Sequence, residues 1–110
     1  MSDVFSPARR HERFSVALSV VCRSSERVLA DQVVNLSAGG ARVQTRAPLE
    51  RGSRHRFAIT VPDVKLRACV VDVEATVAWA SADGMGLQFT KLHDGIDDYL
   101  RRLERASHSY

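Results

Sequence analysis

Apolar residues recur at every second position over most of this 110-residue chain. The first run begins at Phe14 and continues through Val16, Leu18, Val20 and Cys22, with mostly small or polar residues between them. A side-chain period of two is typical of a β-strand with one buried face. Similar runs predict further strands over residues 28–36, 41–45, 55–61, 65–80 and 85–89. We therefore expect about six short strands to make up most of the fold.

The connections between these strands predict how they pair. Ser37-Ala38-Gly39-Gly40 is typical of a tight reversal, so residues 28–36 and 41–45 should be antiparallel neighbours. Within residues 65–80 the apolar side changes parity around Val70, which predicts a bulge or a corner there. Such a break would help the sheet to close on itself.

Only the last segment has helical spacing. Ile96, Tyr99, Leu100 and Leu103 follow one another at i, i+3, i+4 and i+7, and Asp94 is the predicted N-cap. Six strands followed by one amphipathic helix predict an all-β fold, a small antiparallel barrel whose helix plugs or flanks one opening.

Length and composition limit the domain organisation. The chain is too short for two domains, so we expect an arm over residues 1–13, one barrel with its helix over residues 14–106, and a disordered tail over residues 107–110. Its hydrophobic share is 45%, yet it lacks the roughly 20 consecutive apolar residues of a membrane span. Residues 1–7 also lack the apolar stretch of a signal peptide, so a cytoplasmic protein is expected.

The reactive residue types form no recognisable catalytic or metal-binding pattern. Cys22 and Cys69 each lie in an apolar run, without the paired spacing of a metal or redox site, and are expected to be buried thiols. The histidines are scattered, and Ser37 has no neighbouring His and acid to activate it. We therefore expect a protein that is not an enzyme and that needs no metal or other cofactor.

Positive charge is concentrated in the first half of the chain. Residues 1–56 contain ten Arg and five Asp or Glu, whereas residues 57–110 contain six Lys or Arg and eight acids. The first half is therefore expected to face an anionic partner.

Two local patterns stand out in that basic half: Arg9-x-x-x-Arg13 just before the first strand, and Asn35-x-Ser37-x-x-Gly40 at the end of the second. Together they resemble the signature of the PilZ domain, a bacterial receptor module for cyclic di-GMP. Residues 77–79, 86–89 and 96–103 also look like the closing strands and terminal helix of that family. The resemblance covers about residues 9–105 and implies a six-stranded antiparallel barrel with a C-terminal helix.

The resemblance also implies which residues bind the ligand. Arg9 and Arg13 would reach the phosphates and the Hoogsteen edge of guanine, with the arm folding over the ligand, and Arg10 is a candidate additional contact. The pocket around one guanine would be formed by the second motif and its turn, that is by Asn35, Ser37, Gly39 and Gly40.

Plainer interpretations of the same residues stay open. The arginines fit a solvated charge cluster, and residues 35–40 fit ordinary hairpin chemistry, which is compatible with a pocket. Trp79 is a candidate for stacking on guanine, but its parity with Val77 favours the core.

The leading interpretation is a receptor without an output domain, which binds cyclic di-GMP, changes shape and signals in trans. Its downstream protein, a component of motility, pili, polysaccharide secretion, transcription or a chaperone system, stays open, as do stoichiometry and oligomeric state. One alternative is a PilZ-like adaptor that binds no nucleotide. The other is a small nucleic-acid-binding barrel, disfavoured because only 6% of the residues are aromatic.

Overall fold

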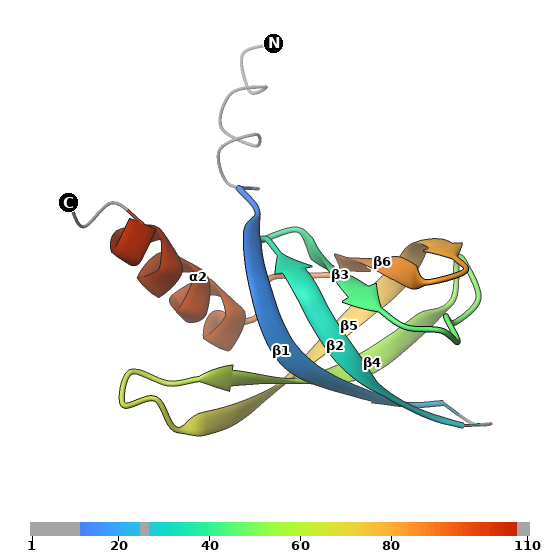
Figure 1. Cartoon of the computed structure of the whole chain (residues 1–110), viewed down its shortest axis with the longest axis horizontal. Helices are drawn as coiled ribbons and strands as arrows, with labels where there is room; N and C mark the ends of the chain where they lie inside the picture. Colours follow the sequence, from blue (N-terminus) through green and yellow to red (C-terminus); the bar gives the residue numbers. More distant parts are fainter. Residues whose placement is uncertain (1–11, 25–26, 108–110) are drawn as a thin grey trace, which may run out of the picture.

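The computed structural model describes residues 12–24 and 27–107, which form a closed antiparallel barrel and one helix (Figure 1). Around the barrel the strands follow the order β1-β2-β3-β6-β5-β4, and the predicted fold class is confirmed. The elements, in chain order, are β1 (Phe14–Arg23), β2 (Val28–Leu36), β3 (Gly40–Gln44), β4 (Arg54–Pro62), β5 (Ala68–Ser81), β6 (Gly84–Phe89) and α2 (Asp94–Ser107).

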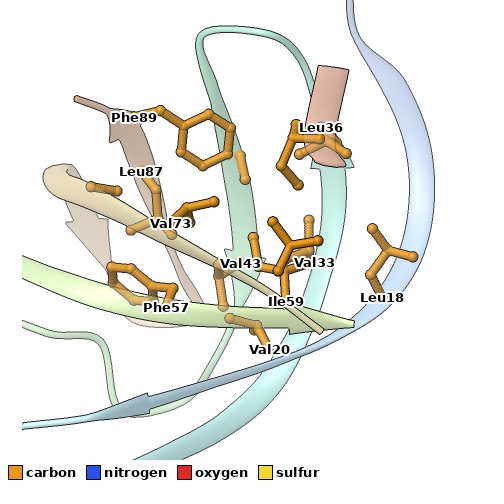
Figure 2. Packing of buried hydrophobic residues seen from close by; sticks show 14 of the residues in the cluster. Leu18, Val20, Val33, Leu36, Val43, Phe57, Ile59, Val73, Leu87 and Phe89 are labelled. Carbon is orange, nitrogen blue, oxygen red and sulfur yellow. The ribbon is translucent and has the colours of Figure 1, made fainter. Parts of the chain in front are cut away.

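The apolar side of each strand faces the interior of the barrel. Val20 pairs with Ile59 across β1 and β4, and Val33 pairs with Val43 across β2 and β3; all four side chains are buried. Figure 2 shows these residues packed in the core together with Phe57. The period-two pattern therefore predicted the inward face of most of the barrel, and the predicted pairing of β2 with β3 is confirmed.

The C-terminal helix extends the core at one end of the barrel. Ile96, Tyr99 and Leu100 are buried with the strand residues, and Arg102 Nη2 donates a hydrogen bond to the Pro62 carbonyl oxygen at 2.9 Å. The expected helix that plugs or flanks the barrel is thus present. Within the described ranges, no helix has the length and apolar character needed to cross a membrane.

The predicted N-cap of this helix is wrong by one residue. His93 Nδ1 accepts a hydrogen bond from the Gly95 N–H at 2.9 Å, and the His93 carbonyl accepts those of Ile96 and Asp97. Asp94 instead lies in the first turn, where its charge suits the helix dipole. A histidine ring nitrogen has taken the capping role that Asp, Asn, Ser or Thr usually fills.

The bulge predicted near Val70 is absent from the β4–β5 ladder. The register of these strands runs without a break from the Arg54–Thr76 pair to the Pro62–Ala68 pair. The apolar parity changes there because the β4–β5 hairpin projects beyond the barrel (Figure 1), so residues 68–70 are exposed on both faces. For the same reason Cys69 is exposed and not buried as predicted, whereas Cys22 is buried and burial raises the pKa of its thiol.

Candidate functional site

A concave surface of about 730 Å³ lies on the outside of the barrel, where the β2–β3 turn meets β5 and β6. Six of the eight residues predicted from the sequence lie on it together: Arg13, Asn35, Ser37, Gly39, Gly40 and Trp79. The other two, Arg9 and Arg10, lie outside the described residues. The remaining lining residues are Ser15, Val34, Ala41, Arg42, Ala78, Gly86, Leu87 and Gln88.

Five of these residues form one continuous row across five strands. Ser15 of β1 pairs with Asn35 of β2, and Asn35 pairs with Arg42 of β3. Arg42 pairs in turn with Gly86 of β6, and Gly86 pairs with Trp79 of β5. We call these five residues the site row. Residues far apart in the sequence therefore meet because they share one level of the barrel.

Register shifts beside the site row turn its side chains outward. One lies between Val33 and Asn35, and another lies between Val77 and Trp79. Without the extra residue in β5, Trp79 would share the buried face of Val77, as its parity suggested. With the shift, Trp79 lines the concave surface and 41% of the residue is exposed. The core-packing alternative for Trp79 is therefore wrong.

The indole of Trp79 lies directly over the backbone of Gly86. A Cβ atom added at Gly86 would lie 2.0 Å from Trp79 Nε1 and 2.5 Å from Trp79 Cε2, so only glycine leaves room for the ring. The Arg42 guanidinium carbon lies 5.9 Å from the centroid of the Trp79 ring, within cation–π range. The two side chains form a flat, positively charged part of the site.

The β2–β3 turn is held by the hydroxyl of Ser37. Only 1% of Ser37 is exposed, and its Oγ accepts a hydrogen bond from the Gly39 N–H at 3.2 Å and donates to the Gly40 carbonyl at 3.4 Å. The Gly39 carbonyl also accepts the Phe89 N–H at 2.9 Å, which ties the turn to β6. The hairpin interpretation of this motif is therefore confirmed, and the turn forms one wall of the concave surface.

Gly40 is required by a close approach between backbones. A Cβ atom at this position would lie 2.0 Å from the Leu87 carbonyl oxygen, which belongs to the paired strand β6 and has little freedom to move. Among the described glycines only Gly52 has a positive φ, at 90°. The glycine at position 40 is therefore explained by steric exclusion and not by a left-handed turn.

Arg13 and Asn35 contact each other across the mouth of the site. Arg13 Nη1 donates a hydrogen bond to Asn35 Oδ1 at 2.6 Å. The described lining residues include the two guanidinium groups of Arg13 and Arg42 but neither Asp nor Glu. The surface therefore suits an anionic ligand that also offers flat rings and hydrogen-bonding edges.

Sequence reasoning missed Arg42, Gly86 and Gln88. Arg42 alternates with the buried Ala41 and Val43, so its outward direction was readable from the sequence. The position of Arg42 beside Trp79 was not readable from the sequence, because it depends on the pairing of β3 with β6 and on the register shift in β5. In the part of the chain that the structure describes, no cluster of three or more His, Cys, Asp or Glu is arranged to hold a metal ion.

The family model of the PilZ domain matches residues 7–106, so the chain belongs to the PilZ family, a family of receptors for cyclic di-GMP. None of the curated proteins matches it significantly.

Solved structures with the same fold agree with this assignment. The inhibitor of motility MotI/DgrA from Bacillus subtilis aligns with a TM-score of 0.70 and 22% identity, over 88% of this chain and 52% of that one. The chain thus spans about half the length of that relative. The PilZ domain of CeSA from a cellulose-synthesizing bacterium aligns with a TM-score of 0.59 and 16% identity, over 84% of this chain and 93% of that one. An uncharacterized Legionella protein aligns with a TM-score of 0.56 and 15% identity, over 90% and 97% of the two chains.

Proposed function

We propose that this protein is a receptor for cyclic di-GMP that catalyses no reaction and passes the signal to another protein in trans. The observation that carries the proposal is that Arg13, Asn35, the Ser37–Gly40 turn and Trp79 line one concave surface. That surface has the size of an ordinary small-ligand site, which spans about 300–1,000 Å³.

Each part of the surface matches one part of the ligand. Asn35 Oδ1 is an acceptor for guanine N–H groups, and the Arg13 guanidinium suits a phosphate or the O6/N7 edge of guanine. The exposed face of Trp79 suits stacking with a purine. Arg9 and Arg10 enter the proposal as phosphate ligands through the motif alone.

Binding requires a local exchange of hydrogen bonds at the mouth of the site. Arg13 now donates to Asn35 Oδ1, the same atom that would accept from guanine. We expect the ligand to separate this pair, giving Asn35 a guanine N–H and Arg13 a ligand oxygen. This exchange would begin to change the surface around Arg13 and Asn35, which a downstream protein would then recognise.

A nucleotide-independent adaptor is the second candidate. It is favoured by the internal hydrogen bonds of Arg13 and Ser37, which give both motif residues a role in the protein without a ligand. The receptor proposal places the protein in the cytoplasm, where a bacterial second messenger would reach it. The downstream protein, for example a component of motility or of polysaccharide secretion, has to be identified by titration with candidate proteins.

Isothermal titration calorimetry distinguishes these functions. We expect cyclic di-GMP to bind, and GTP, cyclic GMP and single-stranded RNA to bind far more weakly or not at all. Arg13→Ala should weaken cyclic di-GMP binding by about 2–5 kcal/mol, or about 30- to 4,000-fold, because a charged ligand group loses its partner. Arg23→Ala is the matched control, since Arg23 is an exposed residue at the other end of β1. Equal affinity of wild type and Arg13→Ala would favour the adaptor.

A further inference from the structure

The β4–β5 hairpin that projects from the barrel has a free strand edge. In this hairpin the Asp63 N–H donates to the Arg67 carbonyl at 2.8 Å, so by alternation the backbone groups of Ala68, Val70 and Asp72 face away from β4. The bond from the Thr90 N–H to the next such residue, Glu74, fits this alternation. The β5–β6 register begins only at Ala75. No described strand therefore pairs with the outer edge of residues 68–72, which we call the β5 edge.

The same hairpin carries the three most exposed large apolar residues of the described chain. Val64, Leu66 and Val70 are 72%, 84% and 63% exposed. Leu66 has a φ of 64°, a conformation that is costly for a residue with a side chain. Asp63 Oδ1 holds the tip in place by accepting the N–H groups of Lys65 and Arg67. The tip is thus a fixed structure that presents apolar side chains to solvent, which is typical of an interaction surface.

The hairpin has a basic end and an acidic end, so two copies in antiparallel orientation have complementary charges. Lys65 and Arg67 precede the β5 edge, whereas Asp72 and Glu74 lie at and beyond its other end. Antiparallel pairing of two copies about Val70 would place the basic end of each hairpin beside the acidic end of the other. Asp72 has no hydrogen bond or ion pair with any residue in the described ranges, so its carboxylate is available to such a partner.

We propose that the β5 edge is the interface of a symmetric dimer, in which a second copy of this chain adds its own β5 edge in antiparallel orientation. Val70 lies opposite Val70 of the second copy on the two-fold axis, and Ala68 lies opposite Asp72 on both sides. This register joins all three outward N–H and C=O groups of each edge. The two hairpins then form a four-stranded sheet between the barrels.

The second copy's hairpin tip has a place to go in this arrangement. A groove of about 600 Å³ lies beside Asp72 and Glu74, with Thr90, Lys91 and His93 also lining it. The hairpin tip of the second copy reaches this groove, and the Leu66 side chain of that tip is covered there. Arg56 and Lys91 also line the groove and reduce the electrostatic gain, so we expect a weak dimer from this short edge.

Sedimentation velocity of the whole protein tests the dimer without any nucleotide. We expect the sedimentation coefficient of the wild type to rise between about 10 µM and 1 mM protein, as for a small interface. Val70→Lys should keep the protein monomeric, because two ammonium groups would meet on the axis. Val28→Lys, at a 58% exposed valine of β2, is the control and should leave the dimer unchanged. A wild type that stays monomeric to about 1 mM overturns the proposal and leaves the edge open to a strand from another protein.

Two further variants test the register. Ala68→Lys should strengthen self-association, because its ammonium group would lie opposite Asp72 of the second copy, and the double variant Ala68→Lys/Asp72→Lys should abolish it, because two ammonium groups would then oppose each other. Val70→Cys in a Cys69→Ser background should form a disulfide-linked dimer under mild oxidation. Failure of both the charge variants and the cross-link would refute this interface. Titration of Val70→Lys with cyclic di-GMP tests the proposed receptor function separately.

Discussion

Gly86→Ala is expected to dislodge Trp79 and so tests whether the site row is built as described. The added Cβ would lie 2.0–2.6 Å from three indole atoms, Nε1, Cε2 and Cδ1. Ordinary contacts of this kind are about 3.5–4.0 Å, so the ring must move by more than 1 Å. Because the clash is with the rigid body of the indole, a small torsional change at its far end does not relieve it.

The cost follows from what the indole covers. Trp79 is 41% exposed, so roughly three-fifths of its surface is covered. For an aromatic residue this amounts to about 150 Å², and at about 25 cal/mol per Å² complete release would cost up to about 4 kcal/mol. The ring only needs to lift from Gly86, and loss of the Arg42 contact adds about 0.5–1 kcal/mol. We therefore expect Gly86→Ala to lower the free energy of unfolding by about 1–3 kcal/mol.

Intrinsic fluorescence reports the displacement directly, because Trp79 is the only tryptophan. The emission of Gly86→Ala should shift to longer wavelength in the absence of any ligand, and chemical denaturation should show the loss of stability. In a Trp79→Ala background the same substitution should cost far less, because the clashing ring is gone. An unchanged emission spectrum together with a stability within about 0.5 kcal/mol of wild type would refute the packing of Trp79 on Gly86.

Three other substitutions have expected outcomes. Ser37→Ala leaves a backbone N–H of the turn without its acceptor and should lower the free energy of unfolding by about 1–2 kcal/mol, measured by denaturant titration; an unchanged value would contradict the turn geometry. Gly40→Ala places a methyl group 2.0 Å from the Leu87 carbonyl and should cost about 1–3 kcal/mol in the same assay, whereas a neutral result would mean that β3 and β6 separate easily. The backbone N–H of Arg67, which donates to Asp63, is the main cause of the lowered pKa of that carboxyl group. The Asp63 carboxylate therefore stabilises the fold at pH values above its ordinary pKa. This stabilisation is lost as the pH falls through the lowered pKa of the folded protein. The difference in unfolding free energy between wild type and Asp63→Asn should therefore shrink in acid.

Most of the barrel was predictable because each strand has one buried face. Period-two alternation marked the inward residues of β1 and β4, and helical spacing marked the inward residues of α2. The turn motif gave the pairing of β2 with β3, and the family signature gave the concave surface where Asn35 and Gly40 meet. These features depend on local patterns that one sequence displays directly.

The errors arose where the fold departs from local rules. Parity placed Trp79 in the core, but the register shift between Val77 and Trp79 turns this side chain outward. The apolar run around Cys69 also predicted a buried thiol, although this part of the hairpin projects beyond the barrel and Cys69 is exposed. The roles of Arg42 and Gly86 in the site depend on side chains of neighbouring strands, and a single sequence does not give the strand order β3-β6-β5.

The site row has a consequence for how such a surface changes over generations. Its five residues come from five strands, so a side chain of the row can be exchanged without altering the backbone path of the other strands. Substitution at Ser15 or Arg42 changes the chemistry of the surface and leaves the inward alternation intact. Gly86 does not share this freedom, since any side chain there displaces the ring above it. Substitutions on one strand can therefore change the ligand preference of the surface without disturbing the other strands, provided that Gly86 is kept.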